Sequence, residues 1–239
     1  MAVLLGVAIV LAGIFGGFVL EGGHLGPLYQ PYELLMIAGG ALGAFVISND
    51  AKAMRATVAA IPTLFQGPKQ TNALYLDLLS LLYDILGKIR KEGLMSVESD
   101  IDNPEQSALF VKFPSILADH HLTEFITDYL RLMVSGNMDP FQIENLMDNE
   151  IEVHHQDGEI PIHAITKLAY GVFGPIASLL ERKLQESTKI YQCVKVTLIA
   201  SLNGYAPTLA VEFGRKLISA VQRPSFAEME SHFKQQKSR

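Results

Sequence analysis

The first 20 residues, MAVLLGVAIVLAGIFGGFVL, contain no charged side chain. At ~1.5 Å per residue, a helix of this length spans about 30 Å, the thickness of the hydrocarbon core of a bilayer. A signal peptide would need a basic segment before the apolar run and a small-residue cleavage site after it, and the stretch has neither. The sequence therefore predicts a membrane-spanning helix at residues 1–20.

A second uncharged run, LLMIAGGALGAFVIS, occupies residues 34–48. It is short for a span by itself, but Tyr29 and Tyr32 before it are typical interfacial anchors, and including them brings the helix into the usual length range. No lysine or arginine occurs in residues 21–33, whereas Lys52 and Arg55 follow the second run. Since basic residues favour the cytosolic side, we expect residues 1–49 to form a hairpin with both ends in the cytosol.

The composition fits a membrane protein with a sizeable aqueous part. Charged residues make up 18% of the 239 residues, against roughly 25% in an average soluble protein. The net charge of -6 gives no electrostatic footprint for nucleic acid, and no nucleic-acid-binding motif occurs. The only cysteine, Cys193, cannot form an intrachain disulfide or a cysteine-ligated metal site, so nothing indicates an oxidising compartment.

Residues 50–159 change to amphipathic helical patterns with cytosolic composition. The stretch NALYLDLLSLLYDILGKIRKEG has apolar residues at helical spacing and ends at Gly93, and LTEFITDYLRLMVSG ends near Gly136. Asp139 and Gln142 predict a capping box with Pro140 in the first turn. We therefore expect an all-α fold, with integral membrane helices and a cytosolic helical domain.

The last part of the chain predicts further cytosolic helices. Ser225 is placed as an N-cap, and Glu228 follows three residues later as its capping-box partner. We expect residues 181–239 to form the cytosolic C-terminal helices.

No residue pattern supports an enzyme or a cofactor. The stretch MDNEIEVHHQD, residues 147–157, is rich in acidic residues and histidine. Its adjacent histidines do not have the i, i+4 spacing of a helical zinc pair, so a solvated helix face is the favoured interpretation. Nucleophile-elbow, phosphate-loop and dinucleotide fingerprints are missing from the sequence. We expect no enzymatic activity, no metal and no cofactor.

A charged set surrounds the Gly93 turn. For an arbitrary protein such a set is most simply a solvated rim. The alternative is a charged docking surface that is held away from the membrane and selects its partner by complementary charge. The set comprises Lys88, Arg90, Lys91, Glu92 and Glu98.

Several long segments in collinear order resemble the A subunit of the bacterial flagellar stator, the MotA family, which is related to ExbB and TolQ proteins. The segments are GGHLGPLYQPYELLMIAGGALGAF, LYLDLLSLLYDILGKIRKEGLMSVESDIDNP, DYLRLMVSGNMDPFQIENLMDNEIE and VKVTLIASLNGYAPTLAVEFGRK followed by RPSF. Together they cover nearly the whole chain.

The resemblance implies a multi-pass protein of the bacterial inner membrane that forms a homo-oligomeric ring around a dimer of MotB-like B subunits. Ion flow through that complex drives torque on the rotor. Charged cytosolic residues of the family engage oppositely charged residues of the FliG-like rotor switch protein. On this basis Arg90, Glu98 and Glu150 are the expected rotor-contact residues, and the docking interpretation replaces the solvated rim.

The resemblance also indicates a missing segment. The family has four membrane helices, of which the third and fourth line the ion path. Here EIPIHAITK, which resembles the approach to the third helix, continues directly into LAYGVFGPIASLL, which resembles the cytosolic half of the fourth. Tyr170 and Pro175 match the end of the fourth helix, with Pro175 implied in gating.

Elementary lengths agree that residues 160–180 do not span a bilayer. The uncharged run 168–180 has 13 residues and reaches about 20 Å. Extending it toward residue 160 would bury Lys167 at a cost of ~2.5–3.5 kcal/mol and include Pro161. We therefore predict a residual membrane-helix junction at 160–180, after a rotor-contacting domain at 50–159.

Three functions remain open on the sequence. The first is a stator subunit that forms an ion channel with its B subunit and generates torque. The second is a non-conducting deletion form that keeps only the assembly or rotor-contact surfaces. The third is an ExbB- or TolQ-like energiser of envelope transport, which the KIRKEGLMSVESD and NGYAPTLAVEFGRK segments disfavour because they resemble the flagellar branch.

Overall fold

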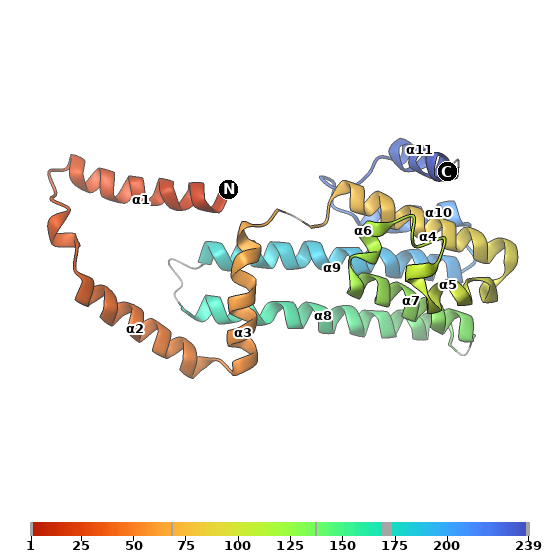
Figure 1. Cartoon of the computed structure of the whole chain (residues 1–239), viewed down its shortest axis with the longest axis horizontal. Coiled ribbons are helices and arrows are strands. Elements are labelled where there is room, and N and C mark those ends of the chain that lie inside the picture. The colour runs from red at the N-terminus through yellow and green to blue at the C-terminus, as the bar shows by residue number, and fades with distance from the viewer. Residues whose placement is uncertain (1, 68, 137, 169–173, 238–239) are drawn as a thin grey trace. The chain divides into compact units, whose positions relative to one another are not determined.

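The computed structural model describes residues 2–67, 69–136, 138–168 and 174–237 (Figure 1). Every regular element in these ranges is a helix, and no strand occurs among them, so the predicted all-α fold is confirmed. The chain divides into two compact units. Unit 1 comprises Met1–Gly67 and Asp157–Leu184, and unit 2 comprises Pro68–Gln156 and Gln185–Arg239.

Unit 1 begins with two apolar helices, α1 (Ala2–Leu20) and α2 (Pro31–Ser48), with the short 3-10 helix η1 (Gly26–Leu28) between them. Proline is the first residue of α2, a position where its missing N–H costs no hydrogen bond. In the described part of the chain, α2 is the one helix long and apolar enough to cross a membrane, and Leu4–Leu20 is a shorter apolar helix. The two predicted apolar helices are therefore present.

The rest of unit 1 has a small core of its own. Helix α3 (Ala51–Ala60) starts at Asp50, whose carboxylate accepts the Ala53 N–H at 2.7 Å, and continues into the 3-10 helix η2 (Ile61–Phe65). The apolar residues that bury one another here come from η2 and from the facing ends of two long helices. They are Leu64, Ile162, Ile165, Ala177 and Leu180.

Helix α4 (Asn72–Glu92) is the central helix of unit 2. The Thr71 side chain caps its start by accepting the Leu74 N–H, and Gly93, with φ of +88°, follows its last residue. The helix ends where the sequence predicts. Its buried residues include five consecutive positions, 78–82, so the protein covers the middle of this helix on all sides. They are Tyr75, Leu78, Leu79, Ser80, Leu81, Leu82, Ile85 and Leu86.

Short helices lead from α4 to α7 (His120–Ser135), which packs against two of them, α5 (Glu98–Asp102) and α6 (Pro114–Leu117). Helix α7 ends at Gly136, whose left-handed conformation, φ of +64°, suits a residue without a side chain. The predicted end of this helix is confirmed. The connecting elements are η3 (Leu94–Val97), α5 (Glu98–Asp102), η4 (Pro104–Gln106) and α6 (Pro114–Leu117).

The two longest helices are α8 (Pro140–Leu168) and α9 (Gly174–Leu202). The predicted capping box opens α8, because the Gln142 N–H donates to Asp139 Oδ1 at 2.9 Å and the Asp139 N–H donates to Gln142 Oε1 at 3.1 Å. Although Pro161 was expected to disfavour a helix, α8 continues through it. A proline removes one helical hydrogen bond, and Ile162 and Ile165 just beyond it are buried, which favours continuation of the helix.

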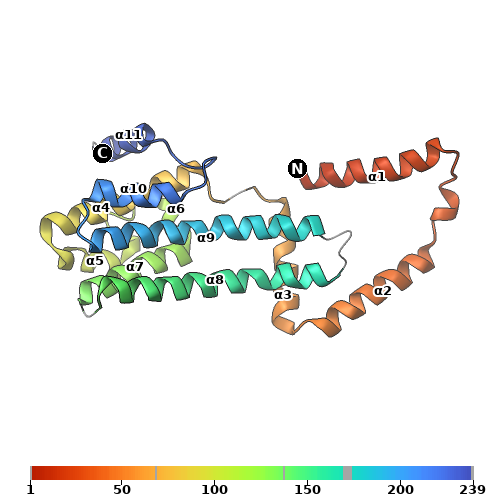
Figure 2. The ribbon, with the colours of Figure 1, turned by 180° about the vertical axis from the view of Figure 1, so that it is seen from behind.

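Helices α8 and α9 run side by side in opposite directions in both views (Figures 1 and 2). Lys195 Nζ lies 2.7 Å from Asp148 Oδ1, and His155 Nδ1 lies 3.1 Å from Thr188 Oγ1. Further along, Gly158 packs against Leu184. As the position on α8 rises, its partner on α9 falls by a similar step, which is the pattern of an antiparallel pair.

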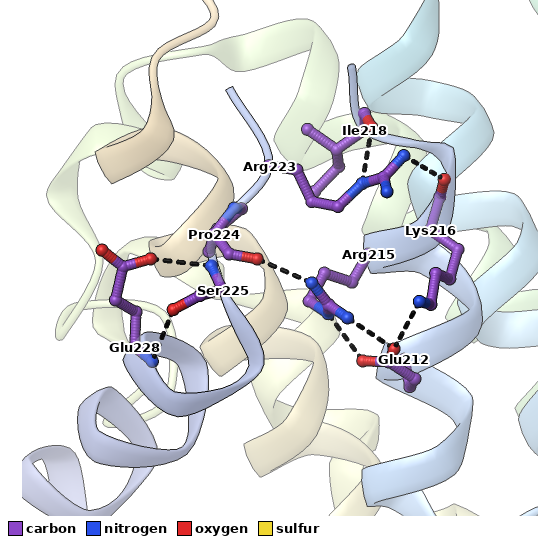
Figure 3. A network of polar contacts seen from close by, with 8 residues as sticks. All are labelled: Glu212, Arg215, Lys216, Ile218, Arg223, Pro224, Ser225 and Glu228. Atoms are coloured by element: carbon purple, nitrogen blue, oxygen red, sulfur yellow. Dashed lines mark hydrogen bonds and ion pairs between the residues drawn. The ribbon is translucent and has the colours of Figure 1, made fainter. Parts of the chain in front are cut away.

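Helices α10 (Pro207–Leu217) and α11 (Phe226–Lys237) both pack on α4. The buried guanidinium of Arg215 donates twice to the Glu212 carboxylate at 2.6 Å and once to the Pro224 carbonyl at 2.7 Å (Figure 3). This ties α10 to the segment that leads into α11. The predicted capping box at the start of α11 is confirmed, since the Ser225 N–H donates to Glu228 and the Glu228 N–H donates to Ser225 Oγ.

Candidate functional site

The Gly93 turn places Arg90 and Glu98 on either side of a sharp reversal of the chain in unit 2. Arg90 lies in the last turn of α4, and Glu98 is the first residue of α5. Both side chains are exposed. The Gly93 N–H closes α4 by donating to the Ile89 carbonyl at 2.8 Å, and the Ser96 hydroxyl donates to the Gly93 carbonyl at 2.6 Å. The turn therefore presents a cation and an anion from adjacent helices to solvent.

Hydrophobic burial anchors the second half of this turn. Val97 is fully buried and Ile101 is 2% exposed, whereas Glu98 and Ser99 between them are exposed. A helix of five residues has too few hydrogen bonds to be stable alone, so these two side chains supply most of its attachment to the core. The side of α5 that carries Glu98 is thereby kept facing solvent.

Lys88 differs from the other charged residues around Gly93, because it is bound within the protein. Its Nζ donates to Asp100 Oδ2 at 2.7 Å, and the Ser107 hydroxyl donates to Asp100 Oδ1 at 2.7 Å. Asp100 is 8% exposed. The sequence grouped Lys88 with the exposed set, and Asp100 and Ser107 were not singled out. The sequence signal for this pair was an aspartate in the DIDNP segment, and nothing distinguished Asp100 from Asp102 as the partner of Lys88.

A hollow of about 470 Å³ lies beside Arg90 on unit 2. Its charged lining has four basic and two acidic side chains. Lys88 is paired with Asp100 and Lys112 with Asp84, so Arg90 and Lys91 are the cations that an anionic group could meet. Lys112 belongs to this hollow although it is 22 residues away from Arg90 in the chain, and it lies 3.4 Å from Asp84. Pro207 and Thr208, at the start of α10, complete one side. The charged residues are Lys88, Arg90, Lys91, Lys112, Asp84 and Glu92.

Glu150 lies at a different place from Arg90. It projects from α8, and its Oε2 accepts the Tyr129 hydroxyl at 2.7 Å. Burial, followed by this hydrogen bond, raises the pKa of Tyr129, so the phenol stays protonated and remains a donor. Glu150 lines a second hollow of about 120 Å³ with His121, Glu124, Asp128, His154 and Tyr191. Arg90 and Glu150 therefore line two different hollows of unit 2.

The two predicted gating residues are described only in part. Tyr170 lies outside the described residues. Pro175 is the second residue of α9, a position in the first helical turn that proline tolerates well.

The described residues contain no group of three or more histidine, cysteine or carboxylate side chains that could hold a metal ion. Cys193 is fully buried, and burial raises the pKa of its thiol to about 12, so it is not a reactive thiolate. What unit 2 offers instead is a surface of fixed charges. The fold and this surface define a helical protein that combines apolar N-terminal helices with a helical unit whose surface carries exposed charges.

Comparisons with known proteins agree with this class. Residues 4–93 match the family described as Motility protein A N-terminal. The chain is 43% identical over 279 aligned positions to Motility protein A of Salmonella typhimurium, with 97% of this chain and 95% of the relative covered. Motility protein A of Escherichia coli gives the same identity and coverage. Chemotaxis protein LafT of Vibrio parahaemolyticus is 29% identical over 283 positions, with 99% of each chain covered.

The chain therefore belongs to the motility protein A family. The alignment also reveals a difference in length. It has 279 positions, whereas the chain has 239 residues, so at least 40 positions of the Salmonella relative stand opposite gaps in this chain. The chain is thus internally shorter than a relative that it matches almost from end to end.

Proposed function

We propose that this protein is the A subunit of a bacterial flagellar stator, a multi-pass protein of the inner membrane that surrounds B subunits as a ring and contacts the rotor switch protein. The observation that carries the proposal is the 43% identity to Motility protein A along 97% of the chain. The apolar helices α1 and α2 support membrane attachment, and the charged turn of unit 2 supports contact with a partner. The role is mechanical and needs no catalytic group.

Arg90 and Glu98 are the proposed rotor-contact residues. They are exposed, opposite in charge and held on adjacent helices, so a partner with the complementary pattern can pair with both at once. Exposed ion pairs contribute only ~0.2–1 kcal/mol each. A contact built from such pairs forms and releases repeatedly, as torque generation requires. Glu150 is proposed as a third and separate contact.

A binding experiment tests the rotor contact. The full chain in detergent micelles is titrated with purified rotor switch protein, and Arg90→Glu is compared with the unaltered chain. We expect Kd to rise on the order of tenfold, because the reversal replaces an attractive charge pair with a repulsive one. Lys234→Glu is the matched control, since Lys234 is an exposed cation on α11 whose side chain is 74% accessible. Equal effects of the two reversals would contradict a specific contact at Arg90.

A second candidate function is favoured by the shortened alignment. We infer that the positions missing relative to the Salmonella protein fall at the 167–168 junction, where the approach to one membrane helix meets the end of another. Neither α8 nor α9 is a candidate membrane span in the described residues, which supports the same placement. In this case the chain keeps its assembly and rotor-contact surfaces but does not conduct ions.

Complementation separates the two candidates. The chain is expressed in a cell that lacks its own A subunit but retains the B subunit and rotor, and swimming is scored together with the amount of protein in the membrane fraction. Restored swimming supports the active stator. Normal membrane insertion without swimming, combined with retained rotor binding, supports the non-conducting form. A variant that restores the family's missing segment is the matched positive control.

A further inference from the structure

The relative position of Arg90 and Glu98 depends on more than the turn that connects them. Between them, Gly93 has φ of +88° and open space around its α-carbon, so no side chain there restricts the turn. Helix α5 has five residues and carries Glu98 at its start. A fixed charge pattern at this turn therefore requires a tertiary contact that joins α4 to α5.

The Lys88–Asp100 pair is such a contact, and it adds a directional hydrogen bond to the hydrophobic anchoring by Val97 and Ile101. Lys88 lies two residues before Arg90 on α4, and Asp100 lies two residues after Glu98 on α5. Lys88 Nζ donates to Asp100 Oδ2 at 2.7 Å, in a setting where the two side chains are 28% and 12% exposed. Such a partly buried, charge-assisted hydrogen bond is stronger than an exposed pair.

The other oxygen of Asp100 is also occupied, which fixes the orientation of its carboxylate. Ser107 donates its hydroxyl hydrogen to Asp100 Oδ1 at 2.7 Å, while the same hydroxyl oxygen accepts the Leu109 N–H at 3.1 Å. Because the Ser107 oxygen already accepts a hydrogen bond, its own hydrogen is directed at the carboxylate. Asp100 is thus held from two sides, by α4 and by the segment after α5.

We propose that Asp100 is a positioning residue that, through Lys88 and Ser107, fixes the geometry in which Arg90 and Glu98 meet the rotor. This inference rests on the proposed rotor contact. Asp100 is buried, so its part in binding is to orient the residues that touch the partner. The neighbouring pair Arg131–Asp102 offers a contrast on the same short helix, because both of its side chains are about half exposed and lie 3.3 Å apart.

A distance measurement tests the geometry without the rotor. Spin labels are attached to Lys91→Cys and Ser99→Cys in the full chain, since both positions are exposed and adjoin Arg90 and Glu98. The native Cys193 is fully buried and is spared by the label. Asp100→Asn should broaden the distance distribution between the labels, and Asp102→Asn should leave it unchanged. An unchanged distribution in Asp100→Asn overturns the inference, whatever the rotor does.

A binding cycle tests whether the geometry matters for contact. Asp100→Asn should raise Kd for the rotor switch protein by about fivefold to tenfold in the unaltered chain. In a chain that already carries Arg90→Ala and Glu98→Ala, the same substitution should change Kd by less than about twofold, because coupled residues are non-additive. A merely structural role would weaken binding equally in both backgrounds and would overturn the inference.

Conservative variants complete the test. Lys88→Arg keeps the charge opposite Asp100 and should bind the rotor as the unaltered chain does, whereas Lys88→Met should reproduce the effect of Asp100→Asn. Similar weakening by Lys88→Arg and Lys88→Met contradicts the proposed ion pair. If the unaltered chain does not bind the rotor protein at all, the proposed function fails, and the spin-label result then reports separately on whether Asp100 orders the turn.

Discussion

Helices α2 and α4 are similar in length and rich in leucine, yet α4 buries many of its apolar residues and α2 buries none of its own. The 18 residues of α2 include no buried side chain, and Leu35, Ile37 and Ile47 are 70%, 70% and 88% exposed. In the 21 residues of α4, eight side chains are buried. The difference lies in the pattern. Apolar residues surround α2 on all sides, with no charge after Glu33, whereas α4 carries Asp77, Asp84 and Lys88 among its apolar residues.

The comparison shows that the residue pattern of a helix indicates whether lipid or protein surrounds it. A helix that is apolar all round has no face suited to water, and lipid can cover it completely. A helix that carries charged residues among its apolar ones reaches water at the charged positions and needs a protein core to cover the apolar ones. The two helices should therefore respond differently to the same substitutions, and the following predictions test that difference from the largest expected effect to the smallest.

The largest effect is expected from Leu82→Ala in α4. Leu82 is fully buried in the core of unit 2, so its truncation should lower the free energy of unfolding by about 2–5 kcal/mol. Leu35→Ala in α2 is the matched control and should change that free energy little, because Leu35 contacts no core. Denaturant unfolding of the full chain in micelles, followed by circular dichroism, measures both. Equal losses would contradict the proposed difference in environment.

The next effect is a charge introduced near the middle of α2. Ile37→Arg should disfavour membrane insertion by about 2.5–3.5 kcal/mol, since an arginine there would lie near the bilayer centre. Phe141→Arg serves as the control, because Phe141 is 71% exposed on α8 in unit 2. Fractionation and alkali extraction of membranes report insertion of each variant. Undiminished insertion of Ile37→Arg would argue against α2 as a span.

A smaller effect concerns close packing. A side chain at Gly214 of α10 would come within 2.9 Å of the Cys193 carbonyl oxygen and would also meet the Thr197 side chain. The backbone cannot shift easily, so Gly214→Ala should cost about 1–3 kcal/mol of unfolding free energy. Gly43→Ala in α2, where nothing lies within 4 Å, should have no such cost within the chain. Thermal melting of the full chain in micelles compares the two variants.

The smallest effect is a pH dependence confined to unit 2. The Arg215 guanidinium, by hydrogen bonding to Glu212, lowers the pKa of that carboxyl below 4.5. A lowered folded-state pKa contributes stability that is present above pH 4.5 and is lost as the pH falls through the folded value. The free energy of unfolding should therefore fall less between about pH 5 and pH 2 in Glu212→Gln, whose side chain does not ionise, than in the unaltered chain. Retention of the full acid sensitivity in that variant would exclude Glu212 as a contributor.

Local signals in the sequence located four helix ends correctly. Gly93 and Gly136 end α4 and α7 because each adopts a positive φ that suits a residue without a side chain. The Asp139–Gln142 and Ser225–Glu228 pairs form their predicted capping boxes, since each requires only residues three positions apart. Pro161 shows the limit of such signals, because its breaking tendency is overridden within α8.

The sequence by itself determined the all-α class, the apolar N-terminal helices and the exposed positions of Arg90 and Glu98, since each follows from residue type and short-range spacing. Only the tertiary structure decided that Lys88 is bound to Asp100, that Lys112 joins the hollow beside Arg90 and that Glu150 lies apart with Tyr129. Those outcomes depend on residues 12 to 22 positions apart being brought together by the shared core. Periodicity predicts which face of a helix is buried, but the partner of each charged side chain is fixed only when the helices pack.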